Sequence, residues 1–96
     1  MKIIWSPRSK NQLAEFAEYI ANDKPNAAQK WLEKIFSEVE KLENLPMSGR
    51  KVPELMQDNY RELLIGNYRI IYKLEKDKIF ILSVRHSKQL LDKNDF

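Results

Sequence analysis

The chain has 96 residues, which is enough for one domain with a modest hydrophobic core. It contains no cysteine and a single histidine, which excludes a disulfide framework, a thiolate metal site and the common zinc constellations. No apolar run is long enough to cross a bilayer, and the first residues lack the apolar centre of a signal peptide. We therefore expect a soluble, cytoplasmic protein.

The net charge of +3 is unevenly distributed along the chain. Residues 1–47 hold equal numbers of basic and acidic side chains, whereas residues 48–96 hold ten Lys and Arg against seven Asp and Glu. This excess is too small for non-specific coating of a nucleic-acid duplex. It favours a local anion site or an acidic protein partner.

The chain begins with a short β-prone run, Lys2 to Trp5, followed by a helix start signal. Ser6 can cap a helix, and Pro7 suits its first position, where the missing N–H has no cost. Apolar residues then recur at helical spacing up to Ile20. We expect this helix to end near Asp23, because the residue before Pro25 is disfavoured in helical geometry.

A second helix is predicted from about Pro25 to Asn44, with Asn26 and Gln29 resembling a capping box. Its apolar positions form one wide stripe: Ala28, Trp31, Leu32, Ile35, Phe36, Val39 and Leu42. The short link between the helices predicts an antiparallel hairpin that packs its apolar side on a sheet.

Three consecutive strands are predicted after a proline-bounded loop at 46–54. Gly66-Asn67 is a two-residue link suited to a type II′ turn, and a second link at 75–78 has two or four loop residues. The predicted order is β-α-α-β-β-β. This order indicates an α+β fold for residues 1–96, a single domain in which a helical hairpin covers a small, largely antiparallel sheet.

Strict alternation of side chains along these strands predicts which residues share a face. It places Arg69 opposite Val84 and makes His86 a diagonal neighbour of Arg69 on one face. Arg61 and Arg85 fall on the other face. A guanidinium on a mostly apolar surface is costly, so Arg69 is either paired within the sheet or waiting for an anionic partner.

The remaining candidates for function are cations. Their guanidinium and ammonium groups bind phosphate or carboxylate, and a histidine can transfer protons near neutral pH. The candidates are Arg50, Lys51, Arg61, Arg69, Arg85, His86 and Lys88. Each has a structural alternative: Glu62 can neutralise Arg69 across the sheet, and His86 can be a packed strand-end residue. Nothing in the sequence predicts a metal or a cofactor.

Several segments together resemble one known family. They are Trp5-Ser6 (WS), Tyr19 to Ala28 (YIANDKPNAA), Leu45 to Glu54 (LPMSGRKVPE), Arg61 to Tyr72 (RELLIGNYRIIY) and Val84 to His86 (VRH). This series resembles the RelE/ParE superfamily, the toxins of bacterial type II toxin–antitoxin modules, which include plasmid stabilisation systems. The resemblance spans nearly the whole chain, and the family's fold has the strand and helix order predicted above.

The resemblance implies one of two mechanisms of growth arrest. In the RelE-like branch, a ribosome-dependent mRNA endonuclease, Arg69, His86 and Arg61 would be the catalytic residues, but no tyrosine follows Val84. In the ParE-like branch, which we favour, the toxin inhibits DNA gyrase without chemistry of its own. A third reading is an inactive homologue that only binds an antitoxin.

In each case the resemblance implies a cognate antitoxin and a toxin–antitoxin hetero-oligomer, with no membrane and no cofactor. Residues expected to bind the target or an anion are Arg50, Arg61, Arg69, Arg85 and Lys88. Residues expected to contact the antitoxin are Trp31, Ile35, Leu64 and Phe80. We expect the antitoxin to be acidic where it meets residues 48–96, because the positive excess lies there.

Overall fold

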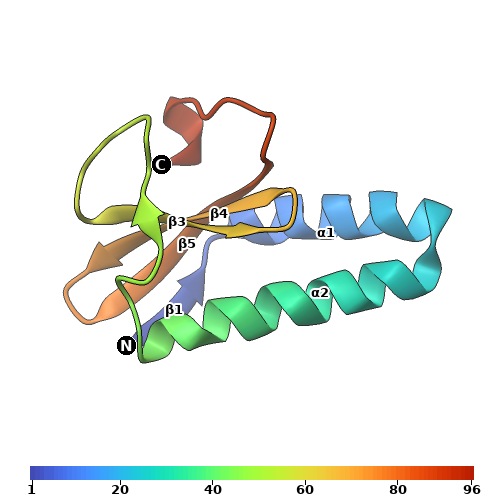
Figure 1. Cartoon of the computed structure of the whole chain (residues 1–96), viewed down its shortest axis with the longest axis horizontal. Helices are drawn as coiled ribbons and strands as arrows, with labels where there is room; N and C mark the ends of the chain where they lie inside the picture. Colours follow the sequence, from blue (N-terminus) through green and yellow to red (C-terminus); the bar gives the residue numbers. More distant parts are fainter.

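A computed structural model describes all of residues 1–96 and confirms the predicted α+β class. A helical hairpin packs on one face of a five-stranded sheet of order β1-β5-β4-β3-β2 (Figure 1). All strand pairs are antiparallel except β1 with β5. The elements are β1 (Lys2–Trp5), α1 (Pro7–Asp23), α2 (Pro25–Glu40), the 3₁₀ turn η1 (Lys41–Glu43), β2 (Arg50–Lys51), β3 (Tyr60–Ile65), β4 (Tyr68–Glu75), β5 (Lys78–His86) and the 3₁₀ turn η2 (Lys93–Asp95).

The ends of the helices follow from their terminal residues. The Ser6 hydroxyl accepts a hydrogen bond from the Ser9 N–H, and Pro7 occupies the first turn of α1, as predicted. The capping box expected at Asn26 is wrong, because α2 already begins at Pro25 and has no side-chain cap. The far end of the hairpin, where α1 passes into α2, extends beyond the sheet (Figure 1).

The two β-hairpins have tight turns. Ile65 pairs with Tyr68, and Gly66 has a φ of +57° whereas Asn67 does not enter the positive-φ region, as the predicted type II′ turn requires. The second hairpin has two loop residues, since Glu75 pairs with Lys78. Lys76 takes a φ of +56° there.

A β-bulge in β5 changes the expected face pattern. Ile71 pairs with Ser83 and Tyr72 with Ile81, so Leu82 is an extra residue without a partner on β4. Ser6 holds this irregularity, because its N–H donates to the Ile81 carbonyl at 2.9 Å and its hydroxyl donates to the Leu82 carbonyl at 3.0 Å. The local sequence of β5 did not reveal the bulge.

The bulge overturns the predicted register beyond it. Arg69 lies opposite Arg85 rather than Val84, so both arginines lie on the sheet face that points away from the helices. We call this the outer face, and the face under the helices the inner face. Alternation then places His86, which pairs with Tyr68, on the inner face. The expectation that His86 neighbours Arg69 is therefore wrong.

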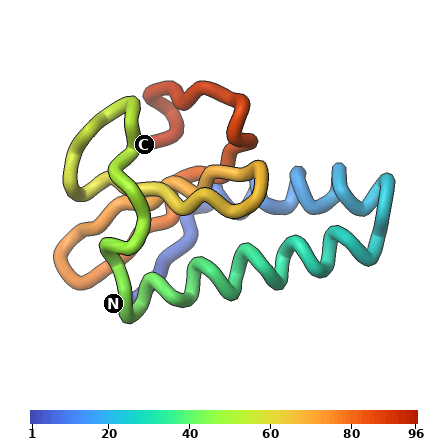
Figure 2. Tube along the Cα trace, in the orientation of Figure 1, coloured from blue at the N-terminus to red at the C-terminus, as the bar shows by residue number.

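The two faces of the sheet are covered by different parts of the chain. Aliphatic and aromatic side chains of the hairpin and the inner face form the core: Leu13, Ile35, Val39, Leu42, Ile65, Ile70, Tyr72, Ile79, Ile81 and Val84. The loop between β2 and β3 and the segment after His86 lie over the outer side (Figure 2). No helix is both long and apolar enough to cross a membrane.

Candidate functional site

Arg69 on β4 is held by two carboxylates of its own chain. Its two terminal nitrogens donate to the Glu54 carboxylate at 2.8 and 2.9 Å, and its Nε donates to Glu62 Oε1 at 2.6 Å. The residue is only 6% exposed. The expectation of a free guanidinium awaiting an anion is therefore wrong, and the alternative of pairing with Glu62 is the one the structure contains.

Glu62 binds a second arginine, Arg50, in addition to Arg69. Its carboxylate is buried, and its other oxygen accepts from Arg50 Nε at 2.7 Å. Arg50 reaches it because β2 pairs with β3 so that Arg50 lies opposite Glu62. One buried carboxylate thus orients two guanidinium groups, which satisfies a charge that would otherwise be costly to bury.

The pKa values in this network favour the charged forms. The hydrogen bonds from Arg69 lower the pKa of Glu54 from 4.5 to about 2, against the opposing effect of burial. The same hydrogen bonds, which Arg69 donates to Glu54, raise the pKa of Arg69. The Glu54–Arg69 pair is therefore ionised at every physiological pH, and Arg69 cannot serve as a proton donor.

Arg85 has its own carboxylate partner. Because Arg85 lies directly across from Arg69, their like charges repel unless each is neutralised. Asp95 is fully buried and lies 3.8 Å from Arg85 Nε and 3.3 Å from Arg8 on α1. The backbone carbonyl of Asp95 also accepts from the Ser83 hydroxyl at 3.0 Å. Sequence reasoning missed Arg8 and Asp95, which are 87 positions apart.

Arg61 holds the loop before β2 and the loop after it. Its guanidinium donates to the backbone carbonyls of Gly49 at 2.8 Å and Asp58 at 3.0 Å. The Tyr72 hydroxyl donates to the Pro46 carbonyl and accepts from the Gly49 N–H. A Cβ at position 49 would lie 2.6 Å from the Glu62 carbonyl, so glycine permits this close approach.

His86 lies on the other side of the sheet from Arg69. Its ring meets Tyr68 edge-on at 5.4 Å between centroids, and its Nδ1 accepts from the Lys88 N–H at 3.3 Å. The three residues expected to be catalytic in a nuclease, Arg61, Arg69 and His86, are therefore not brought together. No group of three or more His, Asp or Glu side chains is arranged to hold a metal ion.

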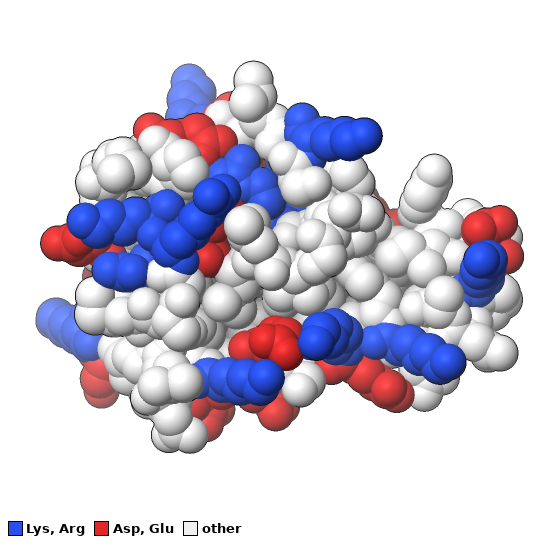
Figure 3. All heavy atoms as spheres, in the orientation of Figure 1, with Lys and Arg blue, Asp and Glu red and all other residues white.

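The residues expected to contact partners differ in exposure. Ile35 is completely buried in the core and offers no surface to a partner, so the expectation that it contacts the antitoxin is wrong. Leu64 is 54% exposed on the outer face, whereas Trp31 and Phe80 are half-buried. Among the cations, Arg50 and Lys88 keep exposed side chains. In Figure 3 basic groups gather at the end of the molecule that carries the strands and the loop, with acidic groups among them.

Comparison with known families agrees with this fold. The profile of the family described as ParE toxin of type II toxin–antitoxin system, parDE, matches residues 3–91. The chain belongs to this toxin family. The toxin-like protein Y4kP of Sinorhizobium fredii is 34% identical over 92% of this chain and 90% of its own length. Toxin RelE3 of Caulobacter vibrioides is 27% identical over 84% of this chain and 88% of its own length.

Two solved structures share the ParE toxin's fold. A chain of the chromosomal ParDE system of Pseudomonas aeruginosa superposes with a TM-score of 0.78 at 18% identity, over 92% of this chain and 97% of that one. A chain of the RelBE2 toxin–antitoxin complex of Mycobacterium tuberculosis gives 0.58 at 16% identity, over 88% and 95% of the two chains. These likenesses establish the RelE/ParE superfamily fold that the sequence motifs predicted.

Proposed function

We propose that this ParE-family toxin arrests bacterial growth by binding DNA gyrase and that a cognate antitoxin neutralises it. The observation that carries the proposal is the ion-pair network around Arg69. A group that stabilises charge on a reacting phosphate must be able to reach it. Arg69 is instead buried between Glu54 and Glu62.

The position of His86 argues against cleavage of RNA for a second reason. A general acid or base must lie within hydrogen-bond reach of the reacting group, together with the residue that stabilises the transition state. His86 is separated from Arg69 by the thickness of the sheet, since the two side chains lie on opposite faces. No tyrosine follows Val84 to replace it. These arrangements favour inhibition by binding over catalysis.

The residues that we assign to target binding are exposed cations of the second half of the chain, above all Lys88. Its side chain is exposed and makes no ion pair within the toxin. An anionic group of the target can therefore pair with Lys88 without breaking an internal contact. Arg50 is the second candidate, although its Nε is engaged by Glu62. We do not assign target binding to Arg61, Arg69 or Arg85, whose side chains hold the loop and the outer face.

We further propose that the antitoxin covers apolar outer-face surface with an acidic segment. Leu64 and Phe80 provide apolar contacts on the outer face. Trp31 packs on Tyr68 on the hairpin side of the sheet, so it would contact a separate part of the antitoxin. The likeness to chains from the ParDE and RelBE2 toxin–antitoxin systems supports a partner of this kind. The positive excess of residues 48–96 favours acidic side chains in that partner.

The experiment that tests the proposed function is brief induction of the toxin alone, with parallel measurement of DNA and RNA damage. We expect growth arrest, double-strand DNA breaks and inhibition of purified gyrase in a supercoiling assay. Co-expression with the antitoxin restores growth. New transcript ends within codons, without DNA breaks, would instead identify a ribosome-dependent nuclease. Normal growth with soluble, folded protein would identify an inactive homologue.

Lys88→Glu probes the binding surface within the same assay. We expect it to weaken both growth arrest and gyrase inhibition severalfold, because the reversed charge opposes an anionic surface on the target. The matched control is Lys30→Glu on the solvent side of α2, which also has no ion pair. Equal activity of the two variants would show that Lys88 does not contribute to target binding.

A further inference from the structure

A pocket with aromatic walls lies beside α1, where β4 begins and β5 ends. It has a volume of about 530 Å³ and is lined by Glu15, Phe16, Tyr19, Tyr68, His86 and Gln89. We call it the aromatic pocket. Its size lies in the range of small-molecule and side-chain binding sites, and none of the contacts that hold the outer-face ion pairs involves its residues.

Tyr68 is the fixed wall of the aromatic pocket. Its ring meets Phe16 edge-on at 5.1 Å and His86 at 5.4 Å, and Trp31 packs on it at 4.8 Å. His86 reaches this position only because the bulge at Leu82 exchanges the faces of the β5 residues that follow it. Burial also raises the pKa of the Tyr68 phenol, which keeps the ring uncharged.

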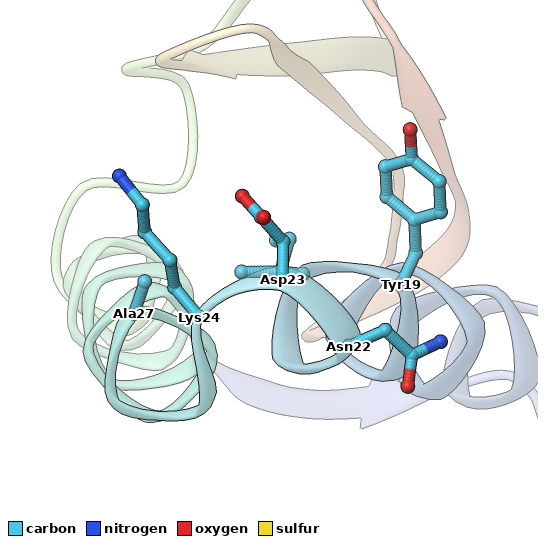
Figure 4. Close-up of a pocket in the computed structure, with 6 residues that line it drawn as sticks. Tyr19, Asn22, Asp23, Lys24 and Ala27 are labelled. Carbon is cyan, nitrogen blue, oxygen red and sulfur yellow. The ribbon is translucent and has the colours of Figure 1, made fainter.

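Tyr19 is the exception in an otherwise packed set of rings, because it is 76% exposed and makes no ring contact. Figure 4 shows its ring rising from α1 on the same side as Asp23. Glu15, Tyr19 and Asp23 follow one another at four-residue spacing, so two carboxylates flank the ring along one side of the helix. A large aromatic ring left in water beside carboxylates is a surface available to a ligand.

The chemistry of the lining selects a cation. The faces of the phenyl and phenol rings carry negative electrostatic potential, and Glu15 is the one carboxylate in the lining. No lysine or arginine lines the aromatic pocket, so a phosphate or carboxylate has no partner there. A guanidinium group can stack on aromatic rings and also hydrogen-bond a carboxylate with planar geometry.

We propose that the aromatic pocket binds an arginine side chain presented by a protein partner, with Tyr19 and Tyr68 stacking on the guanidinium and Glu15 pairing with it. This site is on the inner-face side of the molecule, opposite the outer-face ion pairs. It lies next to Lys88, which falls between the lining residues His86 and Gln89, and it does not depend on gyrase being the target. The Glu15 carboxylate supplies the charge, and the rings exclude water from one side of the bound group.

The test uses N-acetyl-arginine amide as the probe and NMR of the full-length toxin as the readout. We expect saturable shifts at the ring signals of Tyr19, Tyr68 and His86. The uncharged isostere N-acetyl-citrulline amide binds at least about fivefold more weakly, as expected for loss of a cation–π contact and an ion pair. Equal binding of both probes, or no saturable shift up to the solubility limit of the arginine probe, would overturn the proposal.

Two variants and one control place the binding in the aromatic pocket. Tyr19→Ala and Glu15→Gln each change an exposed side chain of α1, so the fold is retained, and each weakens arginine binding about fivefold. Glu33→Gln removes an exposed carboxylate from α2 and leaves binding unchanged. If Glu33→Gln weakens binding as much as Glu15→Gln, the probe responds to general surface charge and the site is wrong. Gyrase inhibition by the Glu15→Gln toxin is measured separately.

Discussion

The two faces of the sheet are held by different physical means. The inner face packs aliphatic side chains such as Ile70, Ile79 and Ile81 against the helical hairpin, and all three are fully buried. The outer face carries Arg69 and Arg85 on adjacent strands, covered by a loop and a C-terminal segment that bring Glu54 and Asp95. The inner face is stabilised by apolar contacts. On the outer face, each buried cation is neutralised by a carboxylate.

This difference teaches how the toxin can keep arginines on a sheet without exposing them. Hydrophobic burial is non-directional, so the inner face tolerates changes that conserve volume. The outer face depends on distances of 2.6 and 2.7 Å that join the Glu62 carboxylate to Arg69 and Arg50. Such a network is sensitive to the loss of one member, because the others are left buried without a partner.

The largest expected effect is on the inner face. Ile81→Ala removes a fully buried side chain from the centre of the core and should lower the free energy of unfolding by about 2–5 kcal/mol. Urea denaturation followed by circular dichroism measures the change. Leu64→Ala, at an exposed position of the outer face, is the control, with an expected loss below about 1 kcal/mol. Equal losses would mean that the inner face is not the main core.

A smaller but clear effect is expected from the buried carboxylate of the outer face. Glu62→Gln keeps the shape of the side chain but turns one hydrogen-bond acceptor into a donor facing an arginine, so unfolding should become easier by about 1.5–3 kcal/mol. Glu40→Gln, an exposed residue of α2 without an ion pair, should leave stability unchanged. An unchanged Glu62→Gln protein would show that the ion pairs contribute nothing to folding.

The smallest effect is a pH dependence at Glu54. Its pKa is lowered from 4.5 to about 2 in the folded toxin, so its contribution to stability is present above pH 4.5 and is lost as the pH falls towards 2. The stability difference between the wild type and Glu54→Gln should therefore be largest at neutral pH and shrink across this window. Denaturant titrations at several pH values measure it.

The matched control for this window is Glu18→Gln, which removes an exposed carboxylate of α1 that has no ion pair. Its stability difference from the wild type should stay nearly flat with pH. A flat profile for Glu54→Gln as well would mean that Arg69 does not hold the Glu54 carboxylate in solution.

Local sequence was sufficient for most of the fold. The start of α1 at Ser6-Pro7 and the turn at Gly66-Asn67 depend on residues adjacent in the chain, where capping and turn geometry act over a few positions. The motifs from Arg61 to Tyr72 also indicated the superfamily. The capping box at Asn26 failed because Pro25 began the helix one residue earlier.

The candidate site was less predictable, since it depends on contacts between distant residues. Glu62 was foreseen as a partner of Arg69, because the two are diagonal neighbours across one hairpin. Glu54, which binds the same guanidinium from a loop, was not foreseen. Arg8 and Asp95 have no pattern that connects them, because their contact exists only once α1 and the C-terminal segment lie on the same sheet.

By itself the sequence determined the order of helices and strands, the hairpin turns and the toxin family, because propensity, capping and apolar periodicity act locally. The tertiary structure decided which face each functional side chain occupies. A single extra residue at Leu82, anchored by Ser6 from 76 positions away, moved Arg85 beside Arg69 and His86 to the aromatic pocket. Side chains on a strand alternate with a period of two, so one inserted residue exchanges the faces of all residues beyond it.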